Sequence, residues 1–197
     1  MIDTDTLLAL GACYKKVAAG EVIFHEGGVA NFYHQLESGS VKWVNIDDEG
    51  KEFIQDIIEP DECFGEIPLF DNLPYVASAI AETNSVILRL HRIPFLQLLT
   101  EKPEIHFAFS KIMSERLRFK FLLLKELASQ DPEHSINSLL NYLKQNKKNF
   151  CIKCNRVNLT RQQIANMTGL RVETVIRTIR QLHEKKLLVI DKGKVYY

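Results

Sequence analysis

Two side chains in the last quarter of the chain, Glu173 and Arg177, have the types and the spacing needed to read the edges of DNA bases. They lie four residues apart within residues 158–182, so they project from one face if this segment is helical. An arginine can bond a guanine edge at two points, and a glutamate can accept a hydrogen bond from the cytosine amino group. A helix face that only meets water usually carries mixed Lys and Glu, so this pair favours DNA recognition.

Two short amphipathic helices around a turn would position these side chains. Thr160 and Gln163 have the spacing of a capping box at the start of the first helix. Gly169 supplies the left-handed residue that ends it. The second helix has one apolar face at three- and four-residue spacing, formed by Val175, Ile179 and Leu182. Helix, glycine turn and helix form a helix-turn-helix unit, whose second helix enters the major groove.

The distribution of charge supports the same interpretation, although the net charge of the 197 residues is zero. From Pro132 onward there are thirteen Lys and Arg against four acidic residues, whereas the preceding residues hold twelve basic and twenty-one acidic ones. A basic module joined to an acidic body is the electrostatic pattern of a DNA-binding domain attached to another domain. Phosphate contacts are expected from Arg161, Lys192 and Lys194.

The composition also excludes several classes of protein. The N-terminus shows no signal peptide, and no apolar stretch is long enough to span a membrane. Four cysteines in a chain of this size do not indicate a disulfide framework. No nucleophile–base set, glycine-rich phosphate loop or HExxH metal pair is present, so an enzyme is not expected. We expect a cytoplasmic protein with no membrane partner.

The remaining chain reads as strands followed by helices. Residues 1 to about 18 suggest a short helix. Short β-rich runs from about residue 20 to 91, with a hairpin turn at residues 47–50, predict an antiparallel barrel or roll. Asp131-Pro132 breaks the helical stretch that follows, and residues 191–194 form the turn of a two-stranded wing. The predicted fold is α+β: a β-roll at 1–102, a long helix at 103–131 and a winged helix-turn-helix at 132–197.

The long helix, expected from Pro103 to about Gln130, is too apolar to be a solvated connector. Its apolar residues recur near three- and four-residue spacing: Phe107, Phe109, Ile112, Met113, Leu117, Phe121, Leu124 and Leu127. Such a face packs along the roll, pairs with a copy of itself, or does both.

This order of parts resembles the Crp/Fnr (catabolite-activator and fumarate-nitrate-regulator) superfamily of bacterial transcription factors. The resemblance extends from about residue 22 to 197 and is carried by FGEIPLF at 64–70, ASA at 77–79 and LTRQQIANMTGLRVETVIRTIRQL at 159–182. It implies a cyclic-nucleotide-binding-like jelly roll and a homodimer paired through the long helix. It also implies a palindromic promoter site on double-stranded DNA and contact with RNA polymerase.

Carried over by position, the resemblance assigns base reading to Glu173 and Arg177. Val172 replaces the arginine of the catabolite activator, which places the reader nearer the fumarate-nitrate branch. Ile176 departs from the serine usual in that branch and could offer only an apolar contact, for example to a thymine methyl group. Arg171 and Arg180 are further positions at which this reader could contact DNA.

The effector pocket implied by the resemblance is degenerate. Cyclic-nucleotide binders of the family carry an arginine eleven residues after Gly65 and then a small hydroxyl residue, but Val76 and Ala77 stand there. Burying a cyclic phosphate requires backbone N–H groups and a cation, whereas this segment retains Glu66 and lacks the family's arginine. We therefore interpret Gly65 and Glu66 as a structural turn. Cyclic AMP is not expected, and the effector is left open.

Metal and haem remain alternatives. Cys151 and Cys154 have metal-ligand spacing but supply only two of the four ligands that structural zinc or a cluster needs. We interpret them as surface cysteines, with a redox switch or a metal site shared between two copies as the alternative. His25, His34, His91 and His106 are conceivable haem ligands without a local signature, so no cofactor is expected. The rival function is a small-ligand, haem or metal/redox sensor whose winged domain contacts protein rather than DNA.

Overall fold

The structure is a computed structural model that describes residues 1–129 and 131–197. Its contacts divide the chain into two compact units, Met1–Met113 and Ser114–Tyr197. We call these the N-terminal unit and the C-terminal unit and describe each by itself.

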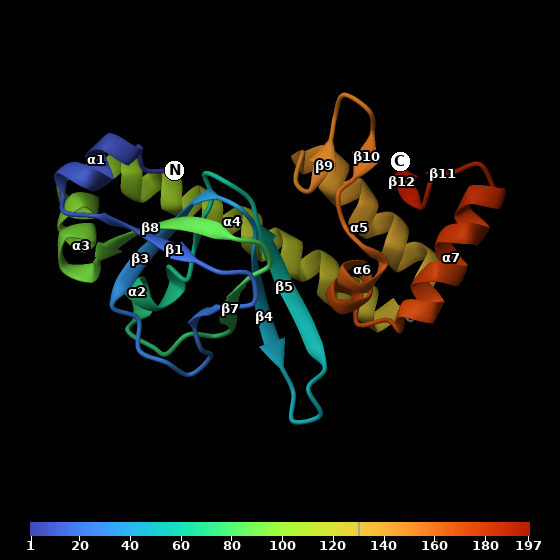
Figure 1. The fold of residues 1–197 in the computed structure, drawn as a ribbon, viewed down its shortest axis with the longest axis horizontal. Coiled ribbons are helices and arrows are strands. Elements are labelled where there is room, and N and C mark those ends of the chain that lie inside the picture. Colours follow the sequence, from blue (N-terminus) through green and yellow to red (C-terminus); the bar gives the residue numbers. More distant parts are fainter. Residues whose placement is uncertain (130) are drawn as a thin grey trace. The chain divides into compact units, whose positions relative to one another are not determined.

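The N-terminal unit is an antiparallel roll of two four-stranded sheets (Figure 1). One sheet has the order β1-β8-β3-β6 and the other the order β2-β7-β4-β5. The strands are β1 (Cys13–Val17), β2 (Val22–Phe24), β3 (Phe32–Ser38), β4 (Val41–Ile46), β5 (Glu52–Ile58), β6 (Cys63–Phe64), β7 (Ser78–Ala81) and β8 (Ser85–His91). The N-terminal segment expected to be only helical holds α1 (Thr4–Ala9) and then β1, because β1 pairs with the distant β8 and short-range pattern does not reveal such pairing.

The β4–β5 hairpin forms where its turn residues predicted it. The Asp47 carboxylate accepts hydrogen bonds from the backbone N–H groups of Glu49 and Lys51, at 3.0 and 2.8 Å. Gly50 has φ +79°, a left-handed conformation that glycine adopts at little cost. Ile46 and Glu52 then begin the antiparallel ladder, and Figure 1 shows this hairpin extending from the roll.

Helices close the roll on one side through aromatic packing. The Tyr33 ring stacks on Phe95 with 4.8 Å between centroids and meets the edge of Phe109 at 5.9 Å. Phe95 and Phe109 come from α3 (Arg92–Glu101) and α4 (Pro103–Ser129), while α2 (Ile67–Asp71) follows β6. Tyr33 and Phe95 are fully buried, so this contact anchors the start of α4 in the N-terminal unit.

The long helix α4 begins at Pro103, as the sequence predicts, and continues for 27 residues. Its predicted end at about Gln130 lies outside the described residues. The division between the two units falls within this helix, after Met113. None of the described helices is long and apolar enough to cross a membrane.

The C-terminal unit is a winged helix-turn-helix, which confirms the predicted α+β fold class. It contains α5 (Pro132–Asn146), β9 (Phe150–Cys151), β10 (Arg156–Val157), α6 (Arg161–Thr168), α7 (Val172–Glu184), β11 (Val189–Asp191) and β12 (Lys194–Tyr196). The strands form a sheet of order β11-β12-β10-β9. The strands of the β9–β10 hairpin have two residues each, which is too short to show an alternating pattern in the sequence.

Candidate nucleic-acid interface and interior of the roll

The first helix of the motif, α6, has the cap that its sequence predicts. The Thr160 hydroxyl accepts from the Gln163 N–H at 3.1 Å, and the Gln163 side-chain oxygen accepts from the Thr160 N–H at 2.7 Å. Gly169 ends the helix with φ +70°. These two ends fix the turn between α6 and α7.

The second helix, α7, separates a buried face from an exposed one. Val175, Ile179 and Leu182 are completely buried, whereas Glu173 and Arg177 are exposed. The exposed face contains a shallow hollow of about 470 Å³, lined by Glu173, Ile176, Arg177, Arg180, Gln181 and Glu184. The fold therefore gathers both predicted base readers, with Ile176 and Arg180, on one accessible surface.

Two other predicted residues lie at the start of α7. Arg171 is the exposed N-cap residue and makes no side-chain cap hydrogen bond. Val172 is half-buried. Neither lines the hollow on the exposed face of α7.

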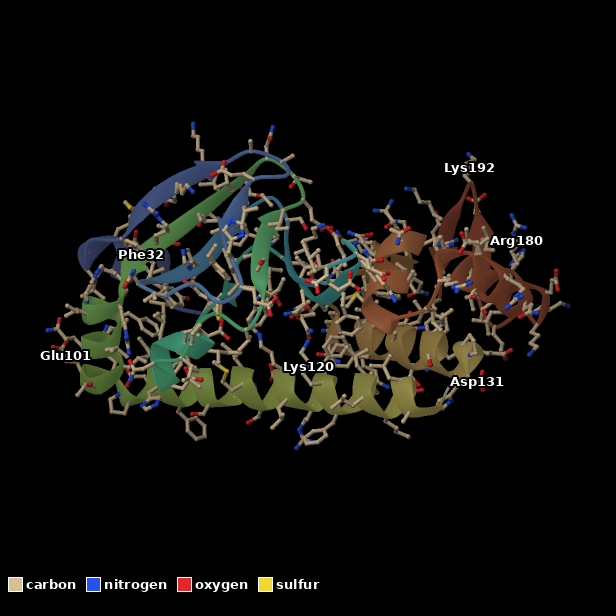
Figure 2. All side chains as sticks on the ribbon, turned by 90° about the horizontal axis from the view of Figure 1, so that it is seen from below. Phe32, Glu101, Lys120, Asp131, Arg180 and Lys192 are labelled. Atoms are coloured by element: carbon tan, nitrogen blue, oxygen red, sulfur yellow. The ribbon has the colours of Figure 1, made fainter. Side chains whose placement is uncertain are left out.

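The wing is a tight hairpin beside a second hollow. Asp191 pairs with Lys194 across a two-residue loop, in which Lys192 and Gly193 have φ +44° and +75°. Two left-handed residues are the requirement of a type I′ turn. In Figure 2 the labelled side chains of Lys192 and Arg180 extend outward from the C-terminal unit.

This second hollow, of about 450 Å³, brings together residues predicted to contact phosphate. Its lining is Arg156, Val157, Asn158, Leu159, Thr160, Arg161, Gly193 and Lys194. Arg161 is half-buried, and this desolvation lowers the pKa of its guanidinium. Arg156 was missed by the sequence analysis, because only the β10–β12 pairing places it beside the wing.

Inside the roll, aromatic rings occupy the space against Gly65. A Cβ atom added to Gly65, which has φ +68°, would lie 2.6 Å from Phe24 Cζ and 3.1 Å from Tyr75 Cε1. The Phe24 and Tyr75 rings stack at 3.8 Å between centroids, and Phe24 lies 5.4 Å from His34 and 6.0 Å from Phe64. We call Phe24, His34, Phe64 and Tyr75 the aromatic cluster.

The other residues predicted for the effector pocket do not form an anion site. The Val76 side chain is 51% exposed, and its backbone oxygen accepts a hydrogen bond from the Asn45 amide at 2.8 Å. Ala77 is buried and offers no hydroxyl, and Glu66 is fully buried at the start of α2. Val76 and Ala77 therefore provide neither the cation nor the hydroxyl that a cyclic phosphate needs.

A different cation, Arg89, lies near the aromatic cluster. Residues paired directly across a sheet point to the same face, so Arg89 of β8 shares a face with His34 of β3. Its guanidinium lies 4.9 Å from the centroid of the Phe32 ring. Burial, together with the charges of Arg89 and Lys15, lowers the pKa of His34 to about 3. The sequence analysis missed this pairing because it depends on the register of β3 and β8.

The candidate metal and haem residues are dispersed. Among the described residues, no group of three or more His, Cys, Asp or Glu side chains could hold a metal ion. Cys151 and Cys154 lie close together on the β9–β10 hairpin, as a pair. Of the histidines considered for haem, His34 is buried, whereas His25, His91 and His106 are exposed.

Comparison with known families matches both units. The model of the cyclic nucleotide-binding domain matches residues 14–102, and that of the Crp-like helix-turn-helix domain matches residues 136–196. Between them these two matches account for most of the chain.

Known relatives and solved structures agree with these matches. The chain is 29% identical over 175 residues to the cAMP-activated global transcriptional regulator CRP of Haemophilus influenzae, covering 88% of this chain and 78% of that protein. It is 25% identical over 197 residues to the transcriptional activator protein Anr of Pseudomonas protegens, covering 98% and 78%.

The fold is similar to that of the c-di-GMP responsive global regulator CLP of Xanthomonas campestris, with a TM-score of 0.78 at 20% identity, covering 98% of this chain and 97% of that one. FixK2 of Bradyrhizobium japonicum gives the same TM-score at 17% identity, covering 94% and 91%.

Proposed function

We propose that this chain, which belongs to the Crp/Fnr superfamily of DNA-binding transcription regulators rather than to an enzyme family, acts as a homodimer that reads a palindromic promoter site without cyclic AMP. The observation that carries the proposal is the exposed face of α7. There Glu173 and Arg177 share one accessible hollow with Ile176 and Arg180, while the opposite face is buried in the unit's core.

In the proposed complex, Arg177 bonds a guanine and Glu173 accepts from a cytosine amino group. Ile176 contacts a thymine methyl group, and Arg171, Val172 and Arg180 lie at the edges of this contact. Val172, Glu173 and Arg177 together support a reader of the fumarate-nitrate type. The protein would then act in the cytoplasm, where it would also contact RNA polymerase.

Phosphate contacts come from the second hollow and the wing. Arg161 and Lys194 line the same hollow, Lys192 lies at the tip of the adjacent hairpin, and Arg156 adds a fourth positive charge. Such contacts fix the register of the protein on DNA without reading its sequence. The salt bridge of Lys185 with Glu133, at 2.7 Å, leaves that lysine outside the proposed phosphate contacts.

Two observations support action without cyclic AMP. The position of the family's phosphate-binding arginine holds an exposed valine, Val76. Aromatic rings of Phe24 and Tyr75 lie against Gly65, where the backbone would have to approach the ligand. A cyclic phosphate would meet neither a compensating cation from this segment nor free space beside Gly65.

The experiment that tests this function is selection of binding sites from random-sequence DNA by the purified full-length protein, with no nucleotide added. We expect enrichment of a palindrome with a guanine–cytosine pair in each half-site. Enrichment only after addition of cyclic AMP would contradict the ligand-independent part of the proposal. No enrichment under either condition would contradict sequence-specific reading as a whole.

A further inference from the structure

The β9–β10 hairpin brings two cysteines together at the surface of the C-terminal unit. Cys151 is the last residue of β9, and Cys154 lies in the loop before β10. Cys154 is exposed and Cys151 is partly exposed. Figure 1 shows this loop projecting from the C-terminal unit. The exposure of the two residues makes both thiols accessible to a reagent in solution.

The loop is built to stabilise a thiolate at Cys151. Its sulfur accepts hydrogen bonds from the Cys154 thiol and from the backbone N–H groups of Cys154 and Lys153, and Arg156 lies directly opposite Cys151 across the hairpin. These contacts lower the pKa of Cys151, and the hydrogen bond from the Cys154 side chain is the largest cause. Donors and a cation around a sulfur favour its nucleophilic form.

The other two cysteines lack this combination. Cys63 is only 1% exposed in the core of the roll. Cys13 is exposed, but it lies on β1 in the other unit, opposite Arg89 of β8. Because no group of three or more potential metal ligands exists among the described residues, the pair at 151 and 154 is suited to sulfur chemistry within one chain.

We propose that Cys151 and Cys154 form a site of reversible thiol–disulfide exchange with a small disulfide such as glutathione disulfide. The Cys151 thiolate attacks one sulfur of the disulfide, whose S–S bond breaks, and the released thiolate takes up a proton. The Cys154 thiol then loses its proton and attacks the Cys151 sulfur, which releases the second small thiol. Two cysteine thiols are oxidised to one disulfide while one small disulfide is reduced to two thiols.

Thiol–disulfide exchange at this hairpin does not depend on DNA binding. The exchange requires only the hairpin and its two sulfurs, so its failure in a thiol assay would leave the DNA selection experiment unaffected. The site is close in sequence to the proposed phosphate contacts, because Arg156 of the second hollow follows Cys154 by two residues.

Differential alkylation of the full-length protein tests the site. The protein is equilibrated in glutathione buffers of increasing oxidising strength, alkylated, reduced, and alkylated again with a reagent of different mass. We expect peptide mass spectrometry to show that Cys151 and Cys154 become oxidised together. The product is a disulfide two hydrogens lighter than the dithiol, and dithiothreitol should restore both thiols. Cys63 should remain outside this exchange.

Single serine variants separate the two roles. Cys154→Ser should trap Cys151 as a stable mixed disulfide with glutathione, because the resolving thiol is absent. In Cys151→Ser, Cys154 should react with glutathione disulfide more slowly than Cys151 does in the other variant. Circular dichroism checks that both variants fold. The proposal is overturned if both wild-type thiols stay reduced, or if each carries its own glutathione. A parallel sample receives Zn²⁺ alone. The proposal is also contradicted if one zinc ion per two chains protects both thiols from alkylation and no disulfide forms in oxidising buffer.

Discussion

At the scale of single residues, Glu173 and Arg177 illustrate why a helix face can be assigned a role from spacing. Four-residue spacing places both on one side of α7, and the burial of Val175 and Ile179 turns that side outward. Arg177 is exposed and lines an open hollow. Its guanidinium is therefore available for a ligand rather than committed to the fold.

Replacing Arg177 with alanine should weaken the specific DNA site by roughly 1–3 kcal/mol and leave non-specific binding nearly unchanged, because a bidentate base contact carries sequence information. Competitive binding to the selected site and to random DNA at one salt concentration measures this. Gln181→Ala, in the same hollow, is the matched control. An equal loss on both DNAs would make Arg177 a phosphate contact.

His34 gives a prediction about stability and pH. Its folded pKa, about 3, lies below the ordinary value of 6.5, so the unfolded chain takes up the proton more readily as the pH falls. The stability contributed by the neutral ring is therefore present above pH 6.5 and is lost between pH 6.5 and 3. Between pH 7 and pH 5 the free energy of unfolding should fall by about 2 kcal/mol from this residue.

The comparison that isolates this effect is urea unfolding of wild type and His34→Phe at both pH values. The phenylalanine ring would replace the buried imidazole among Phe24 and Phe64 without a titrating group. The difference between the two proteins removes the contribution of carboxylates that titrate in both. An identical pH dependence in the two proteins would show that folding does not lower the pKa of His34.

These residues also show where sequence reasoning stops. Glu173 and Arg177 depend on local helical spacing, as do Thr160 and Gln163 of the capping box, so short-range pattern is sufficient for them. Arg156 and Arg89 acquire their positions from strands far apart in sequence, at the β10–β12 and β3–β8 pairings. The aromatic cluster likewise joins four separate segments, and no sequence period connects them.

At the scale of elements, α4 has one face that is buried within this chain and another face that is exposed. Phe109 is buried in the N-terminal unit, while Phe119 and Leu123 are buried in the C-terminal unit, where Phe119 stacks on Tyr142 at 4.3 Å. A second face stays open along the helix, at heptad spacing: Phe107, Ser110, Ser114, Leu117, Phe121, Leu124 and Ala128. Phe107, Phe121 and Leu124 are 77%, 64% and 61% exposed. This open face is the proposed seam between two copies.

Leu124→Glu should therefore break the dimer while leaving each unit folded, because the leucine is exposed within one chain. Burial of one such side chain contributes roughly 1.5–3 kcal/mol, and the change occurs in both copies, so the dimer dissociation constant should rise by about a hundredfold or more. Sedimentation equilibrium measures it. Ala108→Glu, an exposed position on the side of the helix away from the seam, should remain dimeric. If both variants had the dimer dissociation constant of wild type, the dimer seam would lie on another surface.

The wing offers a prediction of a different kind. Lys194 begins β12 and shares the second hollow with Arg161, where a phosphate would meet positive charge without a base edge. Lys194→Ala should lower the salt slope of DNA binding by about one and leave the preferred sequence unchanged. Affinity measured across a salt series tests this, with Lys16→Ala in β1 as the control. An unchanged slope would remove Lys194 from the phosphate contacts.

At the scale of the whole molecule, charge and function divide along the chain in the same way. The acidic residues lie mainly before residue 132 and the basic ones after it, so attraction to DNA is confined to the part that reads it. The roll keeps the architecture of a nucleotide-binding domain, and its family model matches residues 14–102. The same architecture does not imply the same ligand, because ligand binding depends on the side chains inside the roll. Rings now fill the space beside Gly65.

Added cyclic AMP should therefore leave the protein unchanged. A ligand present at a hundred times its dissociation constant would add about 2.7 kcal/mol to stability, so the unfolding temperature with about 1 mM cyclic AMP is a sensitive readout. We expect no shift for wild type. Restoring the missing groups with Val76→Arg and Ala77→Ser should still give none, because Phe24 and Tyr75 would remain against Gly65. A shift in wild type would refute ligand independence, and a shift only in the double variant would show that the missing cation, rather than the rings, excludes the nucleotide.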